Sequence, residues 1–219
     1  MTDDEGREAG GVRIYGETDD DGADEFDVPV YGTTETEDDD DDDFDIPVYG
    51  DTDTSDDEPD LDGIAVGVAD YAVTDRPRTL STSGVGSCVG LAVYDDESEV
   101  AGLLHFMLPT ADESRGRHHP DAKFADTGLE AMLADMTNLG AELTDAWAKF
   151  AGGATMVDFE TDGRPVGERN VDAIEFLLDE HGISLVATDT GGRSGRTITF
   201  EPQTEELLVR TAVGTEKRL

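Results

Sequence analysis

Two residues in the sequence could together perform nucleophilic catalysis, a single cysteine and a histidine seventeen positions later. Cys88 is the only cysteine in the chain, and it follows the small residues GVGS, which leave main-chain N–H groups open to a ligand. A thiolate attacks a carbonyl carbon when an imidazole takes up its proton and N–H donors stabilise the oxyanion. His105 is the candidate imidazole, and Gly86 and Ser87 are candidates for main-chain support of the oxyanion. The alternative is that Cys88 packs as a small apolar side chain.

The segments around Cys88 and His105 have the pattern of two paired strands. Residues 87–95 (SCVGLAVYD) and 100–108 (VAGLLHFML) are apolar, and DESE between them is typical of a turn. Antiparallel pairing about Asp96 and Glu97 places Cys88 opposite His105, with Cβ atoms about 4.5–5.5 Å apart. We therefore expect a thiolate–imidazolium pair in which the imidazolium lowers the pKa of the thiol and acts as a general acid.

The rest of the second part of the chain alternates between strand and helix patterns. Strands are expected over 63–73, 146–154, 183–189, 197–201 and 206–212, and helices over 123–140 and 167–182. The first helix has Leu129, Met132, Leu133 and Met136 at helical spacing, and Gly140 and Gly182 are expected helix ends. This order predicts an α+β fold rather than a repeating βαβ unit.

The first 62 residues differ sharply in composition from residues 63–219. They carry 27 Asp and Glu against two Arg, whereas the remainder carries 27 acidic and 13 basic residues. We expect a disordered acidic tail over 1–62, because self-repulsion and few apolar residues oppose collapse. FDVPVYG at 26–32 recurs as FDIPVYG at 44–50, with VRIYG at 12–16 as a fainter copy. These repeats are either an internal duplication or linear docking motifs that become ordered on a partner.

The charge of the chain excludes some classes of protein. No basic stripe is available to bind phosphates, so nucleic-acid binding is not expected. A net charge of −39 with only three lysines is typical of a halophilic protein whose repulsion is screened by salt, and an acidic interaction surface is the alternative. No apolar run could span a bilayer, no signal peptide is evident, and one cysteine excludes an internal disulfide. We expect a cytoplasmic protein without membrane insertion.

Several separated motifs together resemble the CheD family of chemoreceptor glutamine deamidases. They run in the family's order from about Gly63 to Arg210: GVGSCVGLAVYD, GLLHFMLP, KFADTGLEAML, FAGGATM, GERNVDAIEFLLDEHGI and DTGGRSGRTITFEPQTEELLVR. The resemblance implies two packed, mainly antiparallel sheets with two flanking helices. It also implies a protein-glutamine glutaminase, which hydrolyses selected glutamine side chains of methyl-accepting chemotaxis receptors to glutamate and ammonia without a metal or a cofactor.

The resemblance also implies a Cys-His-Thr site. The cysteine motif corresponds to Cys88, the His-x-Met-Leu-Pro motif to His105, and the threonine six residues before the cysteine to Thr82. The family commonly has a hydrophobic residue after this threonine, whereas this chain has Ser83, so Ser81 and Ser83 remain alternatives to Thr82.

The implied partners are the cytoplasmic helical region of the receptors and a CheC-type phosphatase of the response regulator. Phe106, Met107 and the loop at 109–121 are candidates for lining the receptor groove. Two alternatives remain: a regulatory binding module for the phosphatase with little catalysis, and a related thiol hydrolase such as a peptidase or a transglutaminase-like enzyme.

Overall fold

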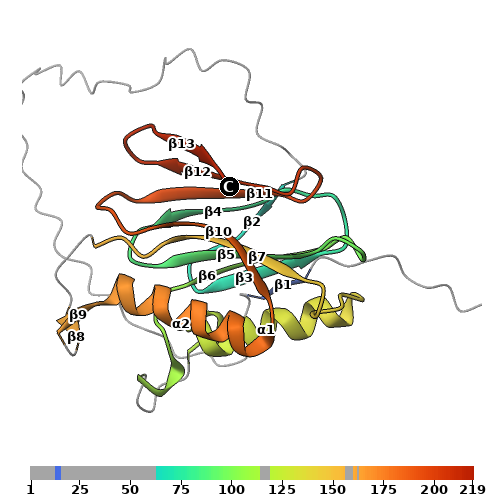
Figure 1. The fold of residues 1–219 in the computed structure, drawn as a ribbon, viewed down its shortest axis with the longest axis horizontal. Coiled ribbons are helices and arrows are strands. Elements are labelled where there is room, and N and C mark those ends of the chain that lie inside the picture. The colour runs from blue at the N-terminus through green and yellow to red at the C-terminus, as the bar shows by residue number, and fades with distance from the viewer. Residues whose placement is uncertain (1–12, 16–62, 114–118, 156–159, 162) are drawn as a thin grey trace, which may run out of the picture. The chain divides into compact units, whose positions relative to one another are not determined.

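The structure is a computed structural model that describes residues 13–15, 63–113, 119–155, 160–161 and 163–219. The repeats at 26–32 and 44–50 therefore lie outside the described residues, as does the predicted tail apart from 13–15. In the described part, two β-sheets pack face to face, and two helices cover the outer face of the larger sheet (Figure 1). The expected α+β fold is confirmed.

The larger sheet contains the strands that carry the candidate cysteine and histidine. Its strand order is β1-β3-β6-β5-β7-β10, and only the β7–β10 pair is parallel. Its strands are β1 (Arg13–Tyr15), β3 (Asp70–Thr74), β5 (Val89–Asp95), β6 (Val100–Phe106), β7 (Trp147–Gly152) and β10 (Ser184–Thr190).

The smaller sheet has the order β13-β12-β11-β4-β2, and its β2–β4 pair is parallel. Its strands are β2 (Ile64–Ala65), β4 (Leu80–Val85), β11 (Arg196–Glu201), β12 (Glu206–Thr211) and β13 (Glu216–Arg218). A short hairpin of β8 (Glu160–Thr161) and β9 (Arg164–Pro165) precedes the second helix.

The helices are α1 (Ala125–Asn138) and α2 (Val166–His181), and the 3₁₀ turns are η1 (Ala111–Glu113) and η2 (Asp121–Lys123). The apolar face expected for α1 is buried against the larger sheet, where each large side chain contributes about 1.5–3 kcal/mol. Gly182 ends α2 in the left-handed conformation with φ 70°, as expected of a glycine after the last turn.

Two apolar clusters hold the three layers together. One lies between the helices and the larger sheet and includes Leu129, Met132 and Phe150. The other lies between the two sheets and includes Leu80, Ile198 and Phe200. A side chain of the larger sheet therefore points either toward the helices or toward the smaller sheet.

The single strand expected over 63–73 is wrong. The chain forms β2 in the smaller sheet, turns, and enters β3 in the larger sheet. Ala69 has a φ of 59° at this turn, and its N–H donates to the His105 carbonyl at 2.9 Å. A left-handed residue cannot continue an extended strand, so the apolar run divides between two sheets.

The expected register of β5 and β6 is also wrong. Gly90, rather than Cys88, lies opposite His105. The connection occupies residues 96–99, with Glu99 at a φ of 55°, because Asp95 pairs with Val100. The centre of the turn lies one residue further along the chain than expected, and the pairing therefore shifts by two residues. Cys88 precedes the first residue of β5 and so lies outside this ladder, but its side chain packs toward the layer between the sheets, where His105 also lies.

Candidate active site

Cys88 lies in the bend between β4 and β5, directly before the first residue of β5. Its side chain is partly exposed and packs against the cluster between the two sheets. The end of β7 holds the main chain of this bend, because Gly153 N–H donates to the Cys88 carbonyl at 2.8 Å and Ala154 N–H to the Gly86 carbonyl at 2.9 Å. Gly152 has a φ of 139°, and a Cβ atom there would overlap the Cys88 carbonyl oxygen. This approach requires glycine.

His105 is fully buried on β6 and forms a hydrogen bond with the smaller sheet. Its Nδ1 lies 2.7 Å from Oγ1 of Thr82 on β4, whose side chain is also buried. Gly90 lies directly opposite His105, and a Cβ atom there would come within 2.6 Å of Ile198 Cδ1 and 3.4 Å of Thr82 Cγ2. The absence of a side chain at Gly90 therefore lets β4 approach closely enough for the Thr82–His105 hydrogen bond.

The alternation of β4 separates Thr82 from its two serine neighbours. Thr82 is buried toward the larger sheet, whereas Ser81 is partly buried and Ser83 is exposed. Among the hydroxyl side chains of the described residues, that of Thr82 lies within hydrogen-bonding distance of the His105 imidazole. This geometry favours Thr82 as the residue that orients the ring.

The second nitrogen of the imidazole is available for chemistry. His105 Nε2 is buried and has no hydrogen-bond partner within the described residues. With Nδ1 engaged by Thr82, Nε2 is the nitrogen left to accept a proton. Cys88 lies one residue beyond the last pair of the β5–β6 ladder, and it packs against the cluster on the side of the larger sheet that faces the smaller sheet.

Burial keeps both groups uncharged near neutral pH. Burial lowers the pKa of His105 to about 4. Burial also raises the pKa of the Cys88 thiol, and a hydrogen bond from the residue's own main-chain N–H opposes this rise. The expected preformed thiolate–imidazolium pair is therefore corrected, because desolvation disfavours both charged forms. The site at rest holds a neutral thiol and a neutral imidazole.

The two groove candidates on β6 and after it lie in different surroundings. Phe106 is fully buried in the cluster beneath the helices, so the expectation that it lines a substrate groove is wrong. Side chains alternate along β6, and the position after His105 faces the opposite layer. Met107 is 36% exposed and remains a candidate. Part of the loop at 109–121 lies outside the described residues.

Asn170 lies close to the candidate site although the sequence analysis did not single it out. This residue is fully buried in α2, and its Nδ2 donates to the carbonyls of Ser87 and Met107, each at 2.9 Å. Its position could have been noticed, because it lies one helical turn before Ile174 and two turns before Leu178, on the apolar stripe of α2. A polar residue on such a stripe needs a buried hydrogen-bond partner.

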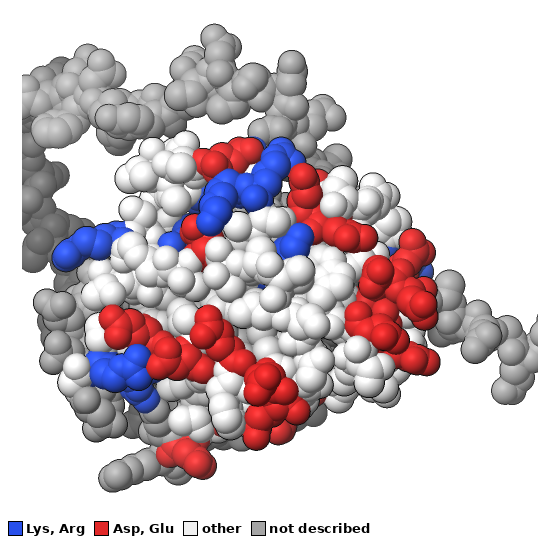
Figure 2. All heavy atoms as spheres, viewed as in Figure 1, with Lys and Arg blue, Asp and Glu red and all other residues white. Residues whose placement is uncertain are grey.

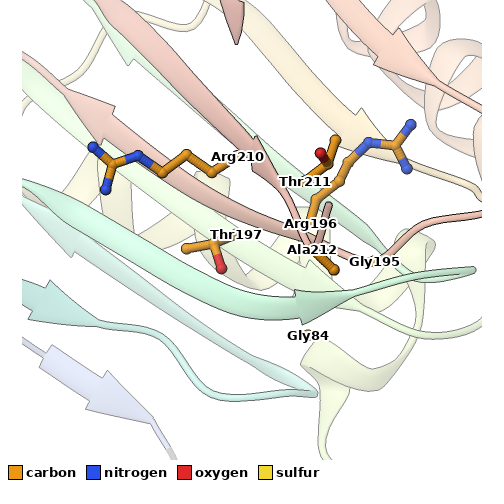
Figure 3. Close-up of a pocket in the computed structure, with 7 residues that line it drawn as sticks. All are labelled: Gly84, Gly195, Arg196, Thr197, Arg210, Thr211 and Ala212. Atoms are coloured by element: carbon orange, nitrogen blue, oxygen red, sulfur yellow. The ribbon is translucent and has the colours of Figure 1, made fainter. Parts of the chain in front are cut away.

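The open pocket in Figure 3 is separate from these residues. It has a volume of about 340 Å³ and is lined by Gly84, Gly195, Arg196, Thr197, Arg210, Thr211 and Ala212. The guanidinium groups of Arg196 and Arg210 point away from each other, so they do not converge on one ligand. Arg196 instead holds the chain between β10 and β11, donating to Asp189 at 2.9 Å and to the Gly191 carbonyl at 2.7 Å.

Comparison with known proteins agrees with the motifs that surround the site. The family described as CheD chemotactic sensory transduction matches residues 107–211. A Haloarcula marismortui protein named probable chemoreceptor glutamine deamidase CheD is 46% identical over 149 residues, which cover 68% of this chain and 85% of that protein. The chain belongs to the CheD family.

Two further CheD relatives, both named chemoreceptor glutamine deamidase, match along nearly their whole length. The Halalkalibacterium halodurans protein is 42% identical over 72% of this chain and 99% of its own. The Bacillus subtilis protein is 42% identical over 71% of this chain and 95% of its own. Among the described helices, none has the length and apolarity needed to cross a bilayer.

Proposed function

We propose that this CheD-family chain hydrolyses glutamine side chains of chemoreceptors to glutamate and ammonia, with Cys88 as the nucleophile. The observation that supports this most strongly is the buried His105, whose Nδ1 is held by Thr82 while Nε2 is left without a partner on the face that Cys88 shares. A thiol, a base and a residue that orients the base are the parts of a generalised catalytic triad. The deamidase names of the curated relatives support the substrate class.

The proposed reaction proceeds through a thioester. His105 Nε2 takes the thiol proton as Cys88 Sγ attacks the carboxamide carbon, and main-chain N–H groups at Ser87 and Cys88 stabilise the oxyanion. The imidazolium then protonates the amide nitrogen, the C–N bond breaks, and ammonia leaves. A water molecule next attacks the thioester, giving one proton to His105, and the glutamate carboxyl forms as the thiol is restored.

Because the resting groups are neutral, proton transfer must accompany attack on the substrate. The buried imidazole has a pKa of about 4, so its protonation is unfavourable before the oxyanion develops. Negative charge on the oxyanion and positive charge on the ring arise together, and each stabilises the other in a poorly solvated site. This coupling limits reaction of the thiol with small electrophiles that bring no oxyanion to the site.

The proposed cellular setting is a cytoplasm of high salt. The exposed side of α2 carries Glu168, Asp172, Glu175, Asp179 and Glu180, and Figure 2 shows acidic side chains over this helix. Basic residues gather over the strands at the opposite end of this view, where β12 and β13 contribute Arg210, Lys217 and Arg218. Salt screens the repulsion among exposed acids and lowers the cost of keeping them together.

The proposed activity is tested by incubating the purified full chain with the cytoplasmic fragment of a chemoreceptor across a range of salt concentrations. We expect ammonia release together with the unit mass gain of Gln becoming Glu, and we expect both to be greatest at high salt. Heat-inactivated protein is the control. The proposal fails if neither product forms at any salt concentration, or if peptide bonds are cleaved instead of side-chain amides.

The role of Thr82 is tested by comparing Thr82→Val with Ser83→Ala. Thr82→Val removes the hydroxyl and keeps the shape, and we expect kcat to fall about tenfold, which corresponds to one lost hydrogen bond of about 1.4 kcal/mol. Ser83→Ala removes an exposed hydroxyl one residue away and should leave kcat unchanged. Equal deamidation rates for Thr82→Val and the wild type would contradict the assignment.

Binding of a CheC-type phosphatase stays a prediction from the family resemblance. A purely regulatory binding module is not favoured, because the curated relatives have the names of deamidases.

A further inference from the structure

The ladder between β5 and β6 ends immediately beside the candidate nucleophile. Val89 and Phe106 are its last pair, and beyond them the two chains take different partners. Met107 N–H donates to the Lys123 carbonyl at 2.9 Å, whereas the Cys88 carbonyl accepts from Gly153 at 2.8 Å. No direct main-chain hydrogen bond among the described residues therefore fixes the separation of the two chains at the level of Cys88.

One buried carboxamide from the helical layer joins the chains at this point. The two Nδ2 hydrogens of Asn170 reach the Ser87 and Met107 carbonyls, one residue before Cys88 and two residues after His105. The side chain is fully buried, so it cannot touch the substrate. Its Oδ1 is also buried and has no hydrogen-bond partner within the described residues, which is a cost that an apolar side chain would avoid. The two donors are therefore the reason for an asparagine at this position.

The bond to Ser87 also sets the direction of the Cys88 N–H. The described chain has no cis peptide bond, and in a planar trans peptide the C=O and the following N–H point in opposite directions. Since the Ser87 carbonyl points toward α2, the Cys88 N–H points away from α2, toward the layer between the sheets. That layer contains Thr82 and His105.

We propose that Asn170 is a positioning residue of the deamidase. Its two hydrogen bonds hold the Cys88 bend beside the end of β6 and orient the Cys88 N–H toward the developing oxyanion. The proposal rests on the proposed function, because it assigns Asn170 to the same reaction. It acts through the main chain on two features at once, the separation of thiol and imidazole and the orientation of an oxyanion donor. Both are geometric requirements of the transition state rather than of substrate binding.

The test compares Asn170→Asp and Asn170→Ala with Ile174→Val. Asn170→Asp keeps the shape but replaces the donors with an acceptor, and Asn170→Ala removes both. Ile174→Val is the control, because it trims a fully buried residue one turn along the same face of α2 without touching the bend. We expect kcat to fall about 100-fold in both Asn170 variants, as for a small misplacement of reacting groups, while KM changes by less than about threefold.

A second readout needs no substrate. The rate at which iodoacetamide alkylates Cys88 is measured against pH for the same proteins. Loss of the oriented N–H removes stabilisation of the thiolate, so the profiles of both Asn170 variants should shift to higher pH, and that of Ile174→Val should match the wild type. An effect on folding alone would not shift this profile in protein that remains folded.

The results separate this inference from the proposed function. Asn170 variants that match Ile174→Val in both kcat and alkylation profile overturn the inference, even if the wild type is fully active. If the wild type releases no ammonia, the proposed function fails, and the alkylation profiles alone decide the role of Asn170. If the Asn170 variants do not fold, NMR of the wild type decides. Slow exchange of the side-chain amide protons of Asn170 supports the two hydrogen bonds to the Ser87 and Met107 carbonyls. Exchange at the rate of a free amide overturns the inference.

Discussion

Cys88→Ala is expected to abolish ammonia release and the mass gain of the receptor fragment while leaving the fold intact. The alanine variant has no nucleophile to form the thioester, and no other cysteine is present in the chain to replace it. Cys88→Ser should be almost as inactive, because an alcohol gives up its proton far less readily than a thiol does. Since the side chain is partly exposed, its truncation should lower the free energy of unfolding by less than about 1 kcal/mol.

Receptor binding provides the control for the Cys88 variants. Their affinity for the receptor fragment should stay within about threefold of the wild type, because a small side chain contributes little to a protein interface. Deamidation by Cys88→Ala at the wild-type rate would eliminate the thiol mechanism. A variant that binds but does not react would locate the defect in chemistry rather than in folding.

His105→Gln should reduce kcat by about 10³-fold, within the range of general acid–base catalysis. Glutamine is polar and of similar size, but it cannot accept the thiol proton and return it to the leaving nitrogen. Leu103→Val is the matched control, because Leu103 is fully buried on the same strand and packs in the same cluster between the sheets. A similar loss of activity in both variants would mean that the effect of His105→Gln comes from packing.

The pH profile of the wild type provides a second check on His105. An imidazole base works only when neutral, and the pKa of about 4 keeps this ring neutral at pH values where an ordinary histidine is protonated. As the pH falls, kcat/KM should therefore hold to well below pH 6.5 and decline only as the pH approaches about 4. A decline centred near pH 6.5 would contradict the burial argument.

The sequence was sufficient to predict that the strands around Cys88 and His105 pair with each other, but not their register. The apolar patterns around Cys88 and His105 correctly indicated paired strands with both residues on one face. The register depended on the turn, whose last residue, Glu99, has a positive φ that is uncommon for glutamate. Turn conformation depends on packing as much as on local sequence, so the pairing was predicted two residues away from its position.

Two other features depended on tertiary contacts that local patterns do not encode. Thr82 and its serine neighbours have the same chemistry, and it is the alternation of β4 against the larger sheet that turns Thr82 toward the imidazole. The pKa of the thiol was expected to fall beside an imidazolium, but desolvation by the surrounding layers raises it. Asn170 contacts carbonyls more than sixty residues away in sequence, so no short motif could reveal its partners.

The most direct test of the account is mass spectrometry of the enzyme quenched in acid during turnover of a receptor fragment. The account predicts a glutamyl thioester on the peptide that contains Cys88 in the wild type, and none in Cys88→Ala. In His105→Gln the occupancy of the thioester should be higher than in the wild type if its hydrolysis slows more than its formation. Continued deamidation by the wild type with no adduct on Cys88 at any quench time, or with an adduct on a different residue, would contradict it.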